Sequence, residues 1–590
     1  MIIQSLVDYY GQLRENPDSG IADLGWCSRQ VRFLLELSPE GRLKAVIPCG
    51  DGKHGVSKVV PEPPKRSNGV APSFLCDNSS YFLGFDAKDD PERTEKCFEA
   101  SRDLHLSLLE GCDGTVARAI AAFFMKWDPA HIDFDAVPGL DDEGVLAGGS
   151  LAICVSQGPS WVEACDDEEI RAAWDSCLVV DDTEKEMVSL VTGKRSPVAR
   201  LHPSIKGIAG AQPSGASLVV FNDESFESYG HAGEQGRNAP VDVASVQAYG
   251  IALNYMTVGR DHRGKLGDTT VAFWSSKQDF DEGNCSVLSV ALGFAPISEG
   301  ESRFEAEQKV KAVLDRVAAG KHIDLDGVSL DEEFFLLGLA PNSSRLAVRF
   351  FLHGSFGDMV RHVADHYRIS DVAHAPYEHP FVSPYWLLDS LERPKSKKAN
   401  DRETFTDSKL SAPLMRAILL GARYPESLYQ NALLRVRAER TVKREHAALI
   451  RAYLIRNANK SESEVTVDMN EENKDVAYTL GRAFYVLERI QEAANDKATV
   501  AERYLSSASA MPATTFPVLL RLSVSHLKKI ARDKPGLADF LEKQLGELMA
   551  QQGADFPKRL SLIDQGSFLL GYYQQKQARY KKKDDQEEQN

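Results

Sequence analysis

The sequence predicts an α+β protein, with an irregular mixed α/β N-terminal part and a C-terminal all-helical bundle. Short apolar runs interrupted by Gly, Pro and Asn characterise the first 300 residues. This alternation of apolar runs with turn-forming residues is typical of short strands and loops. Continuous helical periodicity characterises the residues after 410. A chain of 590 residues is also too long for a single core, so we expect three or four compact units.

The N-terminal elements follow from local patterns. Residues 1–13 place their apolar side chains on one helix face and lack the basic start of a signal peptide, so they predict a short amphipathic helix. Residues 29–60 alternate apolar runs with turn signals and predict a β-meander or hairpins. Residues 61–78 are too rich in Pro, Gly and Asn for regular structure and predict a loop. YFLGF (81–85) then predicts a strand, and residues 93–111 predict a helix.

The central elements are predicted in the same way. LAICVS (151–156) predicts a strand between acidic stretches that we expect to be solvated loops and helix ends. SLVVF (217–221) predicts another strand, and the residues from Val243 to Met256 predict a helix. TTVAFWS (269–275) predicts a strand by its β-branched and aromatic content. A last strand, RLAVRFFLHGS (345–355), interrupts an otherwise helical pattern.

These elements divide the chain into four predicted regions. Residues 1–260 form an N-terminal α/β region, residues 261–400 a second mixed α/β region that ends in a charged linker (391–409), and residues 401–468 a basic helical region. Residues 469–590 contain five helical segments and predict a self-sufficient bundle. Its breaks are predicted at Met511–Pro512, Pro535–Gly536 and Gly553–Pro557.

Composition narrows the class of protein. The net charge is −17, but residues 401–590 hold 30 Lys and Arg against 26 Asp and Glu, a net of +4, so residues 1–400 carry −21. The nine cysteines form no C-x-x-C pair and predict reduced thiols rather than disulfides or metal ligands. No apolar run approaches the ~18 residues of a membrane span. We therefore expect a cytoplasmic protein without membrane contact.

Catalytic signatures are missing from the sequence. The Gly210–Gly215 spacing of a phosphate-binding loop is followed by Ala-Ser where a Lys is required, and neither H-E-x-x-H nor G-x-S-x-G occurs. His362 and His366 are four residues apart on a predicted helix, where we expect them to face solvent or cap the helix. We therefore expect no enzyme activity, no catalytic residue, no metal and no cofactor.

Two loops carry side chains suited to DNA. In the first, Lys65 and Arg66 supply charge, while Ser67 and Asn68 precede the turn-forming Gly69. Such a loop can bind phosphates and present an amide to a base edge. An ordinary surface turn is the alternative.

The second loop lies within residues 200–241 and contains Lys206, Gln212 and Ser214 among several glycines. Glycines let a backbone approach a nucleic-acid strand closely. Asn68 and Gln212 are the predicted base readers, since amides both donate and accept. A purely structural Gly-rich loop is the alternative.

Basic residues also mark two helical segments. Residues 431–456 hold seven basic and two acidic residues, and Arg437, Arg440, Arg444 and Arg451 would form one stripe on a single helix. Such a stripe predicts a surface that binds a phosphate backbone, and Arg423 lies just before it in the sequence. A solvated basic face is the alternative, and a break near Thr441 would divide the stripe between two helices. In the predicted bundle, the candidate nucleic-acid contacts are Lys528 and Lys529, with Lys558 and Arg559 further along.

Four segments together resemble one family. NPDSGI (16–21), PKRSNGVAPSFLCDN (64–78), LHPSIKGIAGAQPSGASLVVFNDESFESYG (201–230) and GARYPESLYQNALLRVRAER (421–440) are similar to the large subunit of type I-C CRISPR Cascade. The resemblance covers nearly the whole chain, and the 201–230 segment is long and unusual enough to make chance similarity improbable.

The resemblance implies a non-catalytic subunit of a ribonucleoprotein complex for antiviral defence. Guide CRISPR RNA would read the target by base pairing, while this subunit reads the protospacer-adjacent motif in double-stranded DNA, helps to open the duplex and stabilises the R-loop. The implied partners are the backbone and RNA-processing Cascade subunits, a recruited helicase-nuclease, and viral anti-CRISPR proteins. It also implies small-subunit copies translated from an internal start, for which Met469 is the candidate. An autonomous nuclease and a protein-binding scaffold are the competing classes.

Overall fold

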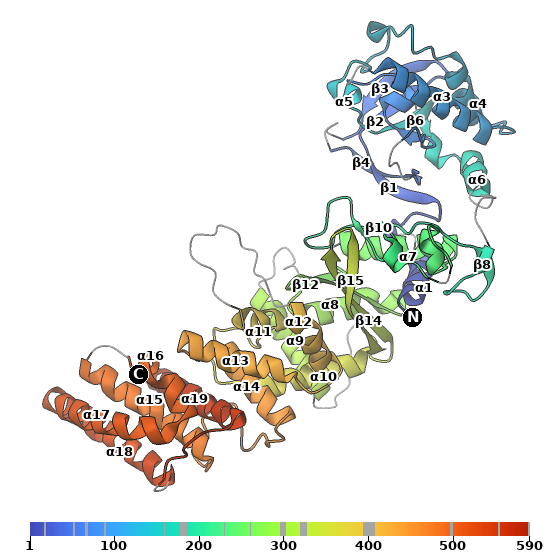
Figure 1. The fold of residues 1–590 in the computed structure, drawn as a ribbon. Coiled ribbons are helices and arrows are strands. Elements are labelled where there is room, and N and C mark those ends of the chain that lie inside the picture. The colour runs from blue at the N-terminus through green and yellow to red at the C-terminus, as the bar shows by residue number, and fades with distance from the viewer. Residues whose placement is uncertain are drawn as a thin grey trace. The chain divides into compact units, whose positions relative to one another are not determined.

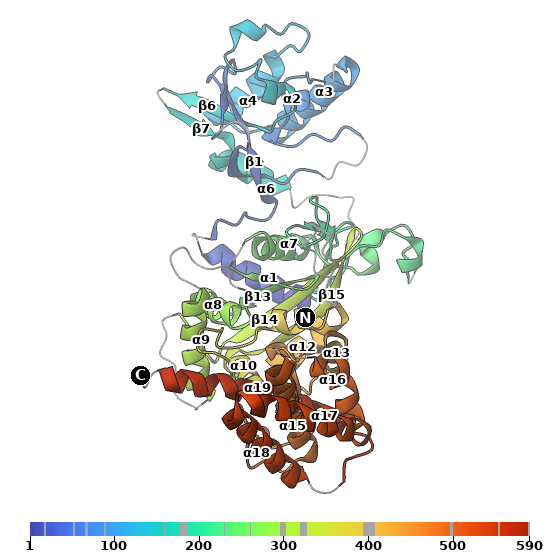
Figure 2. The ribbon, with the colours of Figure 1, turned by 90° about the vertical axis from the view of Figure 1, so that its left-hand side faces the viewer.

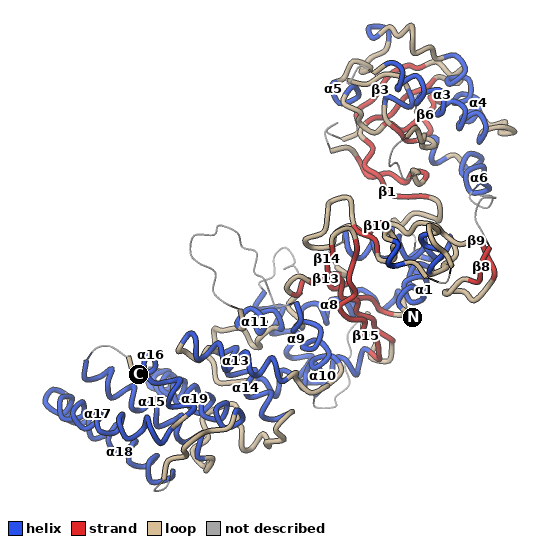
Figure 3. Tube along the Cα trace, viewed as in Figure 1, coloured by secondary structure: helices blue, strands red, loops and turns tan. Residues whose placement is uncertain are grey.

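The chain folds into two compact units. Figure 1 shows the ribbon of the computed structural model. Unit 1 comprises Met1–Ser204 and Ser217–Tyr255, and unit 2 comprises Ile205–Ala216 and Met256–Asn590. Strands are confined to the first 355 residues of the described chain, and only helices and loops follow them (Figure 3). The predicted α+β class is therefore confirmed. The structure describes all residues except 17–18, 51–53, 65–68, 88–89, 159, 178–185, 229, 260, 295–302, 319–326, 393–407, 496–498, 553–554 and 588–590.

Unit 1 begins with the predicted amphipathic helix and is built around a five-stranded sheet. Its strands are β1 (Trp26–Val31), β2 (Phe33–Leu37), β3 (Leu43–Pro48), β4 (Val56–Pro61), β5 (Cys76–Asp77), β6 (Leu151–Gln157), β7 (Ser160–Glu163), β8 (Glu186–Val188) and β9 (Arg195–Pro197). Its helices are α1 (Ile2–Glu15), α2 (Ser79–Phe82), α3 (Pro91–Leu108), α4 (Thr115–Lys126), α5 (Glu143–Leu146), α6 (Glu168–Cys177) and most of α7 (Val243–Val258).

The five-stranded sheet pairs residues that are far apart in sequence. β2 and β3 form an antiparallel hairpin, and β2 runs parallel to β6, with Phe33 opposite Leu151. β5 and β7 also pair with β6. β6 is buried along almost its whole length, because neighbouring strands flank it and α4 packs on it and on β2. The meander predicted for 29–60 is correct only for the β2–β3 hairpin, since β1 pairs with β4 in a separate two-stranded sheet.

Two strand predictions in this part of the chain are wrong. The residues of YFLGF lie in and after the short helix α2, with Tyr81, Phe82 and Leu83 buried. A short apolar run cannot by itself distinguish a buried helix from a buried strand. In SLVVF only Ser217 belongs to a strand, β11 (Ala216–Ser217), and the next four residues are half-buried loop. β-branched residues favour a strand only where a ladder partner is available.

Unit 2 combines a sheet with a large helical part. The sheet has the order β10 (Ser204–Ile205), β11, β15 (Arg345–Ser355), β14 (Glu333–Asn342), β13 (Thr269–Ser275) and β12 (Arg263–Leu266). α8 (Asp281–Ala291) packs on β13, while α10 (Phe356–Ser370) and α12 (Ser408–Leu419) pack on β15. The remaining helices of this part are α9 (Arg303–Ala318), α11 (Pro384–Ser390), α13 (Glu426–Glu439) and α14 (Arg444–Arg456).

The C-terminal residues form the five helices that the sequence predicts (Figure 2). They are α15 (Val476–Asn495), α16 (Val500–Ala510), α17 (Pro512–Asp533), α18 (Pro535–Gln552) and α19 (Leu562–Glu587). Glycines allow α15 and α19 to pack closely. A Cβ atom on Gly481 would lie 1.9 Å from the carbonyl oxygen of Phe568, and one on Gly571 would lie 2.3 Å from that of Tyr478.

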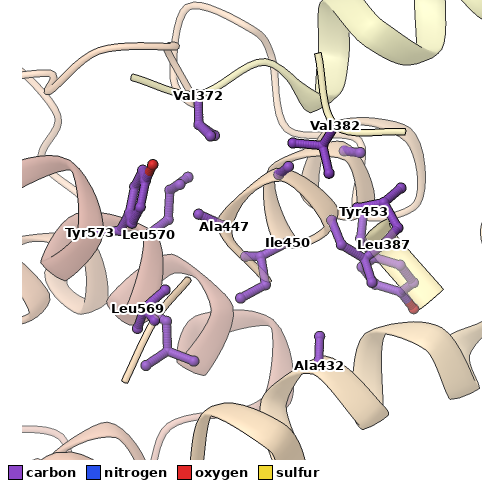
Figure 4. Close-up of a cluster of buried hydrophobic side chains, with 14 of the residues drawn as sticks. Val372, Val382, Leu387, Ala432, Ala447, Ile450, Tyr453, Leu569, Leu570 and Tyr573 are labelled. Atoms are coloured by element: carbon purple, nitrogen blue, oxygen red, sulfur yellow. The ribbon is translucent and has the colours of Figure 1, made fainter. Parts of the chain in front are cut away.

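The bundle shares its core with the helices that precede it. Ile450 and Tyr453 of α14 belong to the same buried cluster as Leu569 and Tyr573 of α19 (Figure 4). The Tyr573 hydroxyl donates to the Ala373 carbonyl at 2.8 Å. The region boundaries predicted at residues 400 and 468 therefore fall inside unit 2, and most of the predicted 391–409 linker lies outside the described residues.

Two further findings concern the thiols and the membrane. None of the nine cysteines forms a disulfide bond, as the sequence predicts. In the part of the chain that the structure describes, no helix combines the length and apolar character needed to cross a bilayer.

Candidate nucleic-acid interface

Hydrogen bonds fix the residues that follow the first predicted DNA-reading loop. Lys65, Arg66, Ser67 and Asn68 themselves lie outside the described residues. Beyond them, the Ala71 N–H donates to the Tyr81 hydroxyl at 3.2 Å.

A buried carboxylate fixes the next turn. The Ser73 N–H donates to Asp77 Oδ2 at 2.8 Å, and the Asn78 N–H donates to Asp77 Oδ1 at 2.9 Å. Asp77 is fully buried, and these hydrogen bonds fix the turn from Ser73 to Asn78.

A buried histidine completes this anchor. Leu75 has a left-handed backbone with φ of 55°, and its N–H donates to His105 Nε2 at 3.1 Å. His105 Nδ1 lies 2.7 Å from the Ser101 carbonyl, so the proton sits on Nδ1 and Nε2 accepts. Burial lowers the pKa of His105 to about 4, which keeps the ring neutral and able to accept at neutral pH.

The second loop is predicted at residues 206–217, but Ala216–Ser217 form β11, so the loop itself covers residues 206–215. Hydrogen bonds to neighbouring elements fix its backbone. The Ala209 N–H donates to Thr270 Oγ1 at 3.0 Å. Arg263 Nη1 donates to the carbonyls of Thr257 at 2.5 Å and Gly207 at 3.3 Å. Gly207 has φ of +74°, and a Cβ atom there would lie 2.1 Å from the Thr257 carbonyl oxygen. Only glycine fits this position.

The side chains predicted to meet DNA point out of this loop. Lys206, Gln212 and Ser214 are all exposed. The loop turns tightly at Gln212, whose carbonyl accepts from the Gly215 N–H at 2.9 Å. The two loops belong to different units, so their joint recognition of one motif stays a prediction.

The predicted arginine stripe is wrong as a single helical feature. α13 ends at Glu439, Arg440 adopts a left-handed φ of 57°, and α14 begins at Arg444. The stripe is therefore divided between two helices that pack on each other. The break falls where the sequence allowed for it, near Thr441.

Three of the four arginines face protein groups. Arg451 is only 2% exposed, and its guanidinium donates to the carbonyls of Val465 (2.9 Å), Thr466 (3.2 Å) and Arg368 (2.8 Å). Burial lowers its pKa to about 10. Arg444 donates to the His379 carbonyl at 2.7 Å and contacts Glu378, and Arg437 donates to Gln565. The burial of Arg451 and the carbonyl acceptors of its Nε and Nη1 groups argue against the predicted DNA contact, which stays a prediction.

The fourth arginine, Arg440, is exposed, and further exposed cations of unit 2 lie outside the stripe. Arg423 is exposed in the loop before α13, and Lys528 and Lys529 are exposed on α17. Arg521 and Arg532 are also exposed on α17 and lie seven residues before and four after Lys528, which places the three on one face. Sequence reasoning missed these two arginines, although their helical spacing was visible.

His362 and His366, four residues apart on α10, each contact a different protein group. His366 is fully buried on α10, with Nδ1 2.6 Å from the Tyr424 hydroxyl, and burial lowers its pKa to about 3. His362 Nδ1 lies 3.0 Å from the Leu419 carbonyl. The expectation that both face solvent or cap the helix is wrong for His366, whose ring fills the core between α10 and Tyr424.

Comparison with known families identifies the chain. The sequence model of the CRISPR-associated protein family Cas_Csd1 matches residues 6–580. The chain belongs to the Cas_Csd1 family. A search of curated proteins finds no match. As a Cas_Csd1 protein, the chain is a CRISPR-associated protein of the Cascade type and a member of a CRISPR-associated complex.

Proposed function

We propose that this Cas_Csd1 protein is the large subunit of a type I-C Cascade complex and recognises the protospacer-adjacent motif in target double-stranded DNA. The observation that carries the proposal is the family match over residues 6–580. The anchored loop at 206–215 supports it, because a rigid backbone that presents an exposed amide and a lysine is suited to reading a base edge beside a phosphate.

In this proposal the protein carries out no chemistry itself. Guide RNA reads the target by pairing, while this subunit binds the motif, aids duplex opening and supports the displaced strand. Cleavage belongs to a helicase-nuclease that the complex recruits in the cytoplasm. Metal-dependent cleavage of DNA by the isolated chain would favour the competing proposal, an autonomous nuclease.

Binding of motif variants by the assembled complex tests this function. Asn68→Ala and Gln212→Ala should each cost about 1–3 kcal/mol on the correct motif and reduce discrimination between motifs, because each removes a base-edge contact. Gln551→Ala, at an exposed position near the end of α18, is the matched control and should change neither quantity. If both loop variants discriminate motifs as the wild type does, these loops do not read DNA.

We further propose that residues 469–590 are also made as a separate small subunit from a start at Met469. The contacts between α15 and α19 favour independent folding. The Tyr478 hydroxyl donates to Gln574 at 2.6 Å, and the Tyr572 hydroxyl donates to Glu488 at 2.7 Å. Both hydrogen bonds lie within the fragment.

The start of the fragment differs from the sequence expectation. By residue type, Asn470 or Asn473 could cap the first helix, but Asp475 does so, accepting from the Tyr478 N–H at 3.0 Å. Asn473 instead supports the cap, because its Oδ1 accepts from the Asp475 N–H at 2.8 Å. Both cap residues follow Met469, so the fragment keeps them.

Separation would uncover part of the bundle. In the full chain, Leu569 and Tyr573 belong to the core shared with α14. A free copy would expose this surface of α19, so we expect it to bind another subunit there and to hold the displaced strand through Lys528, Lys529, Lys558 and Arg559.

Mass spectrometry of a complex expressed from the intact gene tests the internal start. A species of residues 469–590 should copurify and should disappear when the Met469 codon and its upstream ribosome-binding sequence are silenced. If no such species appears, the internal start is wrong, whereas the large-subunit assignment is unaffected.

A further inference from the structure

Three buried side chains of unit 2 gather beside the β12–β13 hairpin. His262 immediately precedes β12, while Asp281 and Cys285 lie on α8. Asp281 and Cys285 are 0% and 1% exposed, and His262 is 7% exposed. Because Asp281 and Cys285 are four residues apart, helical periodicity places both side chains on one face of α8.

The spacing of the three groups fits a coordination sphere. Cys285 Sγ lies 3.4 Å from His262 Nδ1 and 3.4 Å from Asp281 Oδ1, and His262 Nδ1 lies 3.7 Å from Asp281 Oδ2. Around a tetrahedral zinc ion with bonds of about 2.0–2.3 Å, ligand atoms are roughly 3.3–3.6 Å apart. The separation of 3.7 Å between His262 and Asp281 is long for a hydrogen bond, but it is close to the distance between two ligand atoms of a tetrahedral zinc ion.

We propose that His262 Nδ1, the Asp281 carboxylate and Cys285 Sγ bind a divalent transition-metal ion, with zinc as the best match. Imidazole, carboxylate and thiolate are the three ligand types that zinc combines in proteins. A neutral imidazole, a thiolate and a carboxylate together carry two negative charges, which one divalent cation balances.

Neighbouring backbone groups hold two of these ligands in place. The Ser275 N–H donates to Asp281 Oδ1 at 2.6 Å, and the Phe273 N–H donates to the His262 carbonyl at 3.0 Å. Such outer contacts orient ligands in metal sites. The Phe273 carbonyl oxygen lies 3.7 Å from Cys285 Sγ, so this oxygen or a water can supply the fourth ligand.

The buried position gives the ion a structural role. It would join the start of β12 to α8, and it would enter as the chain folds, since all three ligands are buried. The site does not depend on the proposed function. It was not predicted from the sequence, because it contains no C-x-x-C pair and His262 is remote in sequence from the D-x-x-x-C pair.

Metal content and cobalt absorption of the full-length protein test the proposal. Protein purified from zinc-supplemented medium should contain about one metal ion per chain, and removal by a chelator should lower its melting temperature. Protein refolded with Co²⁺ should show a thiolate-to-cobalt charge-transfer band. Cys285→Ser should abolish this band, whereas Cys177→Ser, at an exposed cysteine, should retain it.

Two results would overturn the site. The first is wild-type protein without bound metal, which decides the question even if the Cys285→Ser variant fails to fold. The second is a cobalt band that survives Cys285→Ser. Either result would make the three residues a hydrogen-bonded cluster in the core.

Discussion

The 206–215 loop and the α13–α14 helix pair use their polar side chains in opposite ways. In the loop, Lys206 and Gln212 are exposed, while the backbone is fixed from behind by Thr270 and Arg263. In the helix pair, Arg444 and Arg451 direct their guanidinium groups to carbonyl oxygens of the protein. Both segments looked like DNA contacts in the sequence. The loop leaves its candidate side chains at the surface, whereas among the four arginines of the helix pair only Arg440 is exposed.

The difference shows that charge alone does not predict exposure. Residues 457–475, between α14 and α15, form no helix or strand, so their carbonyls need donors from elsewhere. An arginine has five N–H donors and can satisfy several carbonyls at once. Arg451 does so for Val465 and Thr466. A basic helix beside an irregular segment can therefore be structural.

The largest effect is expected for Arg451→Ala. The substitution removes a buried guanidinium and its hydrogen bonds to three carbonyls, of which the bond to Val465 is fully buried. We expect the lost packing and hydrogen bonds to lower the free energy of unfolding of unit 2 by about 2–4 kcal/mol. Urea unfolding and faster hydrogen exchange of residues 457–475 measure the loss. Arg423→Ala, at an exposed arginine, should change stability by less than about 0.5 kcal/mol. A folded Arg451→Ala protein of normal stability would return Arg451 to the candidate DNA contacts.

The anchor of the first loop should depend on pH. His105 has a pKa of about 4 in the folded protein, against about 6.5 when unfolded. The contribution of neutral His105 to the free energy of unfolding is therefore complete above about pH 6.5 and is lost as the pH falls to about 4. At pH 5 the free energy of unfolding should be lower by about 2 kcal/mol. Hydrogen exchange of residues 71–78 between pH 7 and 5 measures this loss.

His105→Gln provides the control for that titration. Glutamine can both accept from the Leu75 N–H and donate to the Ser101 carbonyl, but it does not titrate. The variant should therefore lose the added pH dependence of residues 71–78. If the variant and the wild type respond equally to acid, His105 is not the group that titrates.

The glycines of the second loop allow a matched comparison. Gly207 and Gly210 both have positive φ, but a Cβ atom on Gly207 would meet a backbone oxygen at 2.1 Å, whereas one on Gly210 would meet only Pro341 Cγ at 3.4 Å. Both alanine variants place a Cβ atom on a left-handed backbone, which is strained. The difference between their stability losses therefore measures the clash of the Gly207→Ala Cβ atom with the backbone oxygen. We expect Gly207→Ala to cost about 1–2 kcal/mol more than Gly210→Ala in thermal unfolding. Equal costs would show that the loop can shift away from Thr257.

The sequence predicted the elements that local periodicity determines. The bundle helices and their breaks follow from apolar spacing and proline, and β13 and β15 follow from their residue types. It did not predict β14 or the separate β1–β4 sheet, because strand pairing joins residues that are distant in sequence. The cluster of His262, Asp281 and Cys285 was missed for the same reason, since folding alone brings β12 to α8.

The same limit applies to the candidate interface. Exposure of Gln212 and burial of Arg451 depend on tertiary contacts that spacing does not encode. The sequence suggested a helix break near Thr441, and the structure places the break at Arg440. The sequence did not show that the guanidinium groups of Arg444 and Arg451 point into the protein. The sequence therefore identified the candidate segments but not which of their side chains face solvent.

The salt dependence of DNA binding by the assembled complex tests the contrast between loop and helix pair most directly. Lys206→Ala should lower the slope of log affinity against log salt by about 1, because one phosphate contact is lost. Arg444→Ala should leave the slope unchanged, because Arg444 already binds the His379 carbonyl and Glu378. A lower slope for Arg444→Ala with an unchanged slope for Lys206→Ala would contradict the account.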